Sequence, residues 1–199
     1  MLRVGVLALQ GDVREHLSAL ARAGAEAVGV RTVAELESVD ALVLPGGEST
    51  TMCRLLRVYA LEQPLRERLA AGMPTLSTCA GLIVLSREVV DGRPDQLALG
   101  ALDVVTRRNA FGRQVDSFEA DLHIEPLGVA PFRGVFIRAP QIETTGDEAR
   151  VIATLNGAAV AVEQGPHIGL CFHPEMTDDL RVHQHFLRVV DEATERSVA

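Results

Sequence analysis

The sequence predicts an α/β fold, with an open, mostly parallel sheet, helices on both of its faces and antiparallel strands added at one edge. In the first half of the chain, short apolar segments typical of buried strands alternate with segments of helical spacing. After residue 100, strand-like segments follow one another closely, which favours antiparallel pairing. The chain of 199 residues is 47% apolar and 23% charged, and neither a repeat nor a Pro/Gly-rich linker divides it. We therefore expect residues 1–199 to form one domain.

The first half supplies the parallel strands and most of the helices. A strand leads into a helix that Gly24 ends, and a later strand ends at Pro45-Gly46-Gly47. The predicted strands span residues 4–9, 26–30, 41–44 and 74–77, and the predicted helices span residues 13–23, 50–59 and 64–71. A further helix is expected directly after Cys79. This alternation implies parallel strands joined by helical crossovers.

The second half supplies short strands and a final helix. The predicted strands span residues 102–106, 115–122, 134–138, 151–155, 158–163 and 168–172. We expect several of them to form the antiparallel additions to one edge of the sheet. Residues 178–195 predict an amphipathic helix with an apolar face, formed by Leu180, Phe186, Leu187 and Val190.

Three segments that carry polar or reactive groups come directly after predicted strands. They are Pro45-Gly46-Gly47, Cys79 and His173. In an open parallel sheet, ligands bind outside the carboxyl ends of the strands. The sequence therefore predicts that these segments meet at one rim of the sheet.

Cys79 is placed as a catalytic thiol would be, on an abrupt turn between an apolar strand and a helix. The N-terminus of a helix favours the reactive thiolate. Downstream, His173 can take the proton and Glu175 can orient His173, which suggests acyl transfer through a thioester. Taken singly, a cysteine after a strand is more often a small buried apolar residue, and His-Pro-Glu is an ordinary loop.

The segment from Leu44 to Thr51 has two interpretations. Its two glycines allow the backbone to approach a ligand, and the N–H groups of Gly47 and Ala80 are expected to hold an oxyanion. Alternatively, the segment is a tight turn in which Glu48 and Ser49 cap the next helix. A phosphate-binding loop is a poor match, because its lysine and its spacing are missing.

Composition excludes several classes of function. A net charge of −8 without a basic cluster argues against nucleic acid binding. No apolar run reaches the ~20 residues of a membrane helix, and the N-terminal segment lacks a signal-peptide pattern. Cys53, Cys79 and Cys171 have neither disulfide-like nor metal-like spacing. We therefore expect free thiols, a cytoplasmic location and no metal site.

The remaining cysteines, the other histidines and the segment from Gln10 to His16 have weaker claims to function. Cys53 is expected to fill a helix and Cys171 to be buried on a strand, while the histidines outside the His-Pro-Glu segment are expected to be exposed or hydrogen-bonded: His16, His123, His167, His183 and His185. Asp12 is expected at the positive end of the first helix.

The motifs together resemble a known family. Pro-Gly-Gly, Thr-Cys-Ala-Gly and His-Pro-Glu in this order are similar to the class I (triad) glutamine amidotransferases. More narrowly, five blocks resemble the glutaminase subunits of pyridoxal 5′-phosphate synthases: residues 5–16, 45–51, 108–119, 136–140 and 172–175. The resemblance implies a flavodoxin-like sheet of the amidotransferase type.

The resemblance also implies the reaction. Cys79 would attack the side-chain amide of L-glutamine, His173 would pass a proton to the leaving ammonia, and Glu175 would orient His173. By the same match, the glutamine pocket would be lined by Gly47, Glu48, Ser49, Arg108, Ile137 and Arg138. Either arginine could meet the substrate carboxylate. No cofactor is implied.

The implied partner is a pyridoxal 5′-phosphate synthase (lyase) subunit in a large hetero-oligomer, which would receive the ammonia. The segment from Gln10 to His16 would contact it. Three alternatives stay open: a glutaminase for another synthase, such as that of histidine biosynthesis; a catalytically weak regulatory or binding module; and an unrelated cysteine hydrolase or redox sensor. The chain departs from the family pattern at Ser77, where glycine is usual, so altered turn geometry is a further possibility.

Overall fold

A seven-stranded sheet forms the centre of the computed structural model, which describes residues 1–108 and 117–198. The strand order is β10-β11-β12-β4-β3-β1-β2. Five strands are parallel: β1 (Arg3–Leu7), β2 (Glu26–Val30), β3 (Ala41–Leu44), β4 (Thr75–Thr78) and β12 (His167–Leu170). Two strands extend one edge in antiparallel pairing: β11 (Ala158–Gln164) and β10 (Arg150–Leu155). The predicted fold class is confirmed.

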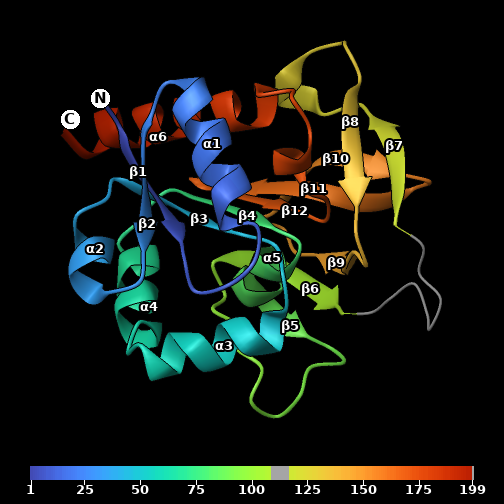
Figure 1. The fold of residues 1–199 in the computed structure, drawn as a ribbon. Helices are drawn as coiled ribbons and strands as arrows, with labels where there is room; N and C mark the ends of the chain where they lie inside the picture. The colour runs from blue at the N-terminus through green and yellow to red at the C-terminus, as the bar shows by residue number, and fades with distance from the viewer. Residues whose placement is uncertain (109–116, 199) are drawn as a thin grey trace.

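Helices cover both faces of this sheet (Figure 1). On one face, α1 (Val13–Ala23) packs against α6 (Arg181–Val198). On the other face lie α3 (Ser49–Val58), α4 (Glu62–Ala70) and α5 (Ala80–Leu85). The helix α3 contacts both α4 and α5, and α5 packs on β3, β4 and β12. The short helix α2 (Val33–Glu37) contacts α4 and β2. In the described part of the chain, no helix has both the length and the apolar character needed to cross a membrane.

Two small sheets lie outside the central one. The first contains β5 (Ser86–Val89), β6 (Leu102–Arg107) and β9 (Gln141–Thr145); the second contains β7 (Phe118–Leu122) and β8 (Phe132–Phe136). Short 3₁₀ turns lie at Glu125–Leu127 and Pro174–Met176. The predicted antiparallel additions are thus confirmed only for β10 and β11. The other late strands form the small sheets or, for β12, a parallel pair with β4. Residues 115–116 of the predicted strand 115–122 lie outside the described residues.

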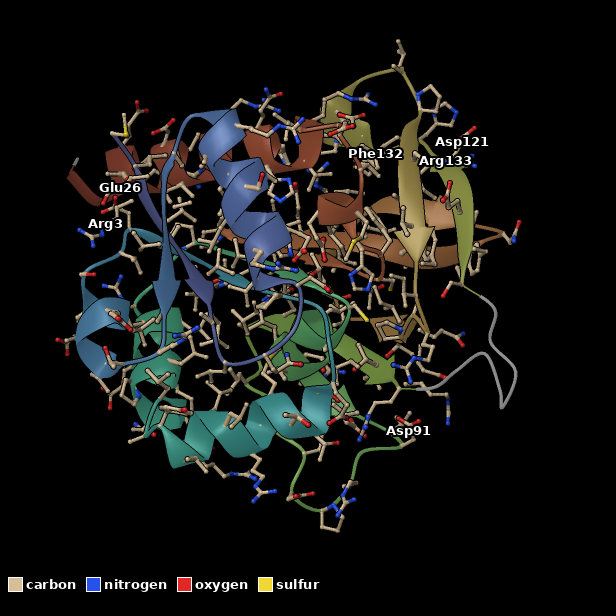
Figure 2. All side chains as sticks on the ribbon, viewed as in Figure 1. Arg3, Glu26, Asp91, Asp121, Phe132 and Arg133 are labelled. Atoms are coloured by element: carbon tan, nitrogen blue, oxygen red, sulfur yellow. The ribbon has the colours of Figure 1, made fainter. Side chains whose placement is uncertain are left out.

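The β7–β8 ribbon is held on both of its faces. On one face, Arg133 of β8 pairs with Glu119 and Asp121 of β7 at 2.9 and 3.1 Å, and Figure 2 shows Asp121 beside Arg133. On the other face, Phe136 stacks on Phe118 with ring centroids 4.7 Å apart and packs against Phe172 at 5.6 Å. Phe172 precedes His173, so this apolar cluster fixes the start of the His-Pro-Glu segment.

Three elements were not predicted from the sequence. The five-residue helix α2 depends on a capping box in which Thr32 and Glu35 exchange hydrogen bonds, rather than on an apolar stripe. The strand β5 follows α5 without an intervening loop, and β9 is largely exposed and polar. None of the three has the periodicity by which strands and helices are recognised.

The helix α5 lies unusually close to β3, because Gly81 faces the end of that strand. A Cβ atom at Gly81 would lie 2.2 Å from the carbonyl oxygen of Leu44 and 2.9 Å from its carbonyl carbon. Backbone atoms cannot yield as a flexible side chain can. The missing side chain therefore sets the depth at which α5, and Cys79 before it, sit on the sheet.

Replacing Gly81→Ala should destabilise the fold by ~1–3 kcal/mol, because the added methyl overpacks a backbone contact. Thermal or urea unfolding of the purified variant measures this. Gly29→Ala on β2 is the matched control, since its Cβ would meet only the Ala8 methyl at 3.3 Å. We expect the control to change stability by less than ~0.5 kcal/mol. Equal stability of the Gly81 variant and the wild type would contradict the close-approach argument.

Candidate active site

A pocket of about 350 Å³ opens at the carboxyl ends of β3 and β4, beside the segment that follows β12. Its lining includes Asp12, Gly47, Glu48, Ser49, Cys79, Ile83, Arg108, Ile137, Arg138, Pro140 and His173. The structure therefore brings together Cys79, His173 and all six residues predicted to bind the substrate. The volume suits a small polar molecule.

Cys79 lies on a strained turn. Its backbone has φ 47° and ψ −103°, a conformation that residues with a side chain rarely adopt. The turn is held because the N–H of Cys79 donates to the carbonyl of Leu170 at 2.8 Å, which extends the pairing of β4 with β12. Cys79 is also the N-cap residue of α5, and its Sγ lies 3.9 Å from the carbonyl oxygen of Ile137. The predicted strand–turn–helix arrangement is the one observed.

Contacts of its backbone N–H and of its ring nitrogen Nδ1 hold His173 in its orientation. Its N–H donates to the carbonyl of Val135 on β8 at 2.8 Å. Its Nδ1 lies 2.8 Å from Glu175 Oε1 and 3.3 Å from Asp12 Oδ2. Nε2 is buried and has no hydrogen-bond partner among the described residues, which leaves it available for proton transfer at the pocket.

The protonation states of His173 and Glu175 depend on each other. Burial disfavours the charged imidazolium, but the interactions with Asp12, Cys79 and Glu175 outweigh it and raise the pKa of His173 well above its ordinary value. Burial likewise disfavours the Glu175 carboxylate, yet interactions with His16 and His173 hold its pKa well below the usual range. The pair is therefore an ionised carboxylate beside a ring that readily holds a second proton.

Gly46 and Asp12 support His173 from the side of β1 and β3. A Cβ atom at Gly46 would lie 2.3 Å from His173 Cε1 and 3.0 Å from Asp12 Oδ2. Only glycine therefore allows the imidazole and the Asp12 carboxylate to occupy their places. Asp12 is the N-cap residue of α1, as the sequence predicted, but its side chain makes no capping hydrogen bond and faces His173 instead.

Beyond Asp12 and His173, the charged groups of the pocket are Glu48, Arg108 and Arg138. Glu48 caps α3, accepting from the N–H of Thr50 at 3.0 Å and of Thr51 at 2.6 Å, so the predicted cap is confirmed for Glu48. Burial works against its charge, but these hydrogen bonds and the Thr51 hydroxyl lower the pKa of Glu48 to about 2. The Ser49 hydroxyl, which was also predicted to cap, instead donates to Gln96 Oε1 at 3.3 Å.

Arg108 and Arg138 differ in their ion pairing. Arg108 Nη2 lies 3.2 Å from Glu48 Oε1. The backbone N–H of Arg108 donates to Asp91 Oδ1 at 2.7 Å, and Figure 2 shows Asp91 on the loop after β5. Arg138, at φ 43°, has no ion-pair partner within residues 1–108 and 117–198. It is therefore the pocket cation that can take an anion without breaking an existing pair.

Ser77 does not occupy a position that requires glycine. It lies within β4 outside the left-handed region and pairs in register with Leu44 and Gly169. Its hydroxyl donates to the carbonyl of Ile168 at 3.0 Å. The strain of the turn lies at Cys79, two residues later, so the serine is accommodated without a change at the nucleophile.

Asp12 and His16 were not predicted from the sequence to contact the catalytic residues. They are four residues apart on α1 and lie on its inner side, where Asp12 contacts His173 and His16 contacts Glu175 at 3.3 Å. The signal available in the sequence was the four-residue spacing of Asp12 and His16, because it follows a strand that ends at the same rim of the sheet. It was ambiguous, because an acidic residue at a helix start has a structural reason of its own.

The other histidines and cysteines follow expectation in part. His123 is exposed, and His16, His183 and His185 have hydrogen-bond partners, although Nδ1 of His183 and Nδ1 of His167 are buried without a partner among the described groups. All three cysteines are free and buried.

One set of described side chains has the geometry to hold a metal ion. It consists of Asp12, His173 and Glu175, whose ligand atoms lie within 4.8 Å of one another. A metal there would compete with the hydrogen bond between His173 Nδ1 and Glu175 Oε1, so the geometry favours proton transfer over metal binding. The expectation that the chain has no metal site stays a prediction.

Comparisons with known proteins identify the family of the chain. A family model described as the SNO glutamine amidotransferase family matches residues 6–192. The pyridoxal 5′-phosphate synthase subunit PdxT of Frankia casuarinae is 59% identical over 187 residues, which are 93% of each chain. The protein of the same name from Kineococcus radiotolerans is 58% identical over 196 residues, 95% of each. A crystal structure titled glutamine amidotransferase is 49% identical, with a TM-score of 0.88 over 94% of this chain and 98% of that one.

Iodoacetamide at neutral pH should label Cys79 selectively in the folded protein. Cys79 lines the pocket, whereas burial raises the pKa of Cys53 and of Cys171, and the thiolate is the reactive form. Peptide mapping by mass spectrometry after a short exposure gives the sites and their rates. Labelling in denaturant, where all three thiols should react, is the control. Comparable rates at Cys53 or Cys171 in the folded protein would contradict the assignment.

Proposed function

The chain belongs to the SNO glutamine amidotransferase family, and we propose that Cys79, His173 and Glu175 form the triad with which it hydrolyses L-glutamine to L-glutamate and ammonia. The observation that carries this proposal is the convergence at one pocket of a strained Cys79 turn, an unpartnered His173 Nε2 and a buried Glu175 on His173 Nδ1. We propose that residues 1–199 act as one domain.

The reaction divides into two acyl transfers. The Cys79 thiolate attacks the amide carbon of glutamine, and the imidazolium of His173 gives its Nε2 proton to the leaving nitrogen, which departs as ammonia. The Cys79 thioester remains. Water then attacks the thioester while neutral His173 accepts its proton, and Cys79 leaves as the thiolate as glutamate forms, which restores the thiolate and the imidazolium. Glu175 stabilises the positive ring at each stage without reacting itself.

We propose that the pocket charges hold the two ends of the amino acid. Arg138 is the cation without an ion pair among the described residues, so it is the available partner for the α-carboxylate. Glu48, whose pKa is lowered to about 2, is ionised at neutral pH and retains acceptor capacity for the α-ammonium group. Arg108 holds Glu48 in place, while Gly47, Ser49 and Ile137 complete the wall.

The tetrahedral intermediates need hydrogen-bond donors for their negative oxygen. We propose the backbone N–H groups of Gly47 and Ala80. Ala80 is the first residue of α5, and the N–H groups of a first helical turn have no acceptor within the helix. Gly47 lines the same pocket as Cys79.

The ammonia would be used by a partner. The named relatives are subunits of pyridoxal 5′-phosphate synthase, so we propose that this chain supplies ammonia to the synthase (lyase) subunit of that enzyme in a hetero-oligomer. A second surface pocket supports contact through α1, because Arg14 and Glu15 line it together with Glu175. The free thiols support a reducing, cytoplasmic location.

Glutamate release from glutamine, by this chain alone and with the cognate synthase subunit, tests the proposal. We expect release to be stimulated by the partner and to fall at least ~10³-fold in Cys79→Ala and His173→Asn, since triad members act as a unit. Cys53→Ser is the matched thiol control and should retain full activity. Release that is absent under both conditions would overturn the glutaminase assignment and favour a binding module.

Replacing Ser77→Gly should leave glutamate release within about twofold of the wild type. The same change should lower stability by ~1–2 kcal/mol, because it removes the hydrogen bond to Ile168 and places glycine in a strand. Steady-state kinetics and thermal unfolding of the variant measure both effects. A large gain in turnover would show instead that the serine distorts the nucleophile turn.

A further inference from the structure

His16 is a fully buried histidine whose two nitrogens meet three polar groups. Its Nε2 lies 3.3 Å from both Thr78 Oγ1 and Glu175 Oε2, and its Nδ1 lies 3.1 Å from Nε2 of His183 on α6. Thr78 immediately precedes Cys79. His16 therefore contacts the last residue before the nucleophile and the carboxylate that orients His173.

The contacts determine where His16 carries a proton. Glu175 is ionised and can only accept, so a bare Nε2 lone pair 3.3 Å from Oε2 would be repelled by it. Nε2 must therefore carry hydrogen; it is hydrogen-bonded with the Thr78 hydroxyl at 3.3 Å and lies at the same distance from Oε2. Oε2 makes no hydrogen bond within the described residues, and a buried carboxylate oxygen without one is costly, so the Nε2–H group 3.3 Å away is the donor placed to offset that cost.

His183 completes this arrangement from α6. Burial, followed by the influence of His16, lowers the pKa of His183 to about 3, so it is neutral at physiological pH. A neutral ring can donate from Nε2 to His16 Nδ1. This leaves His183 Nδ1 as an acceptor without a partner, which agrees with its isolation among the described groups.

We propose that His16 is a positioning residue for the hydrolysis proposed above: its Nε2–H holds Oε2 of Glu175, so that Oε1 stays directed at His173 Nδ1. His16 does not line the pocket, and the proposed role depends on its contact with Glu175. The inference rests on the proposed function for its kinetic readout, and on the reactivity of Cys79 for an independent one.

Three substitutions separate the Nε2 donor from the shape of the side chain. His16→Leu keeps similar bulk without a donor, and His16→Gln places an amide N–H₂ near the position of Nε2. His16→Asn is polar, but its shorter amide ends near Nδ1. The matched control is His167→Leu, because His167 is also a buried histidine but lies on β12 at the end away from His173.

Loss of the donor should lower kcat for glutamate release roughly tenfold or more in the Leu and Asn variants, because a buried charge loses its partner. KM should stay within about twofold, since His16 is not part of the pocket. His16→Gln should recover most of kcat, and His167→Leu should match the wild type. Equal losses in Gln and Leu would overturn the proposal, as would wild-type kinetics in Leu and Asn.

The pH dependence of kcat/KM is a second test, because it would not change if the role of His16 were purely structural. Without His16, the pKa of Glu175 should rise, so the acid limb of kcat/KM should shift to higher pH in the Leu and Asn variants but not in Gln. The titratable groups that face Glu175 are His173 on its own segment, Asp12 and His16 on α1, and His183 on α6. The charged groups of the adjacent surface pocket are Arg14, Glu15, Arg22 and Asp178.

Alkylation of Cys79 by iodoacetamide as a function of pH distinguishes the two possible failures. A wild type that releases no glutamate would overturn the proposed function. The positioning role would still be supported if the pH dependence of Cys79 alkylation shifts in His16→Leu and His16→Asn and returns to that of the wild type in His16→Gln. An active wild type with unchanged kinetic and alkylation profiles in every variant would overturn the positioning role alone. Unfolding temperatures confirm that each variant tested is folded.

Discussion

The parallel pairing of β4 with β12 is the constraint on which the site depends. Thr78 pairs with Leu170, and the N–H of Cys79 extends that ladder by one more hydrogen bond. These strands are far apart in the sequence, yet their carboxyl ends are adjacent. The residues that follow them, Cys79 and His173, must therefore meet at one rim. Pro45-Gly46-Gly47 joins them because β3 pairs with β4 on its other side.

Burying the ionised Glu175 in this place requires compensation from several elements. A carboxylate removed from water is unfavourable unless opposite charge or N–H groups replace the solvent. Here His173 meets one oxygen and His16 lies beside the other. Asp12 adds a second carboxylate near His173, and the ring accordingly favours its protonated form. The acid–base character of the site is thus a property of the cluster rather than of His173 alone.

The sequence predicted the parallel core and the triad because both depend on local patterns: apolar strands followed by glycine, cysteine or His-Pro-Glu. It did not predict β5, β9 or α2, which lack periodicity, and it did not predict which late strands leave the central sheet. Asp12 and His16 were missed for a different reason. Their roles depend on the strand order β12-β4-β3-β1, which places the segment after β1 and the segment after β12 at one rim, and the spacing within the first segment does not reveal that order by itself.

The helix α1 connects the surface of the molecule to its reactive groups. Asp12 at its N-cap and His16 one turn later face the triad, while Arg14 and Glu15 between them line a surface pocket that also reaches Glu175. A helix moves as a rigid unit over one turn, so a displacement caused at its exposed side is transmitted to both His173 and Glu175. A partner bound against α1 would therefore act on orientation and on proton affinity together, without touching the pocket. This arrangement offers a physical route by which hydrolysis can be tied to the presence of the protein that uses the ammonia.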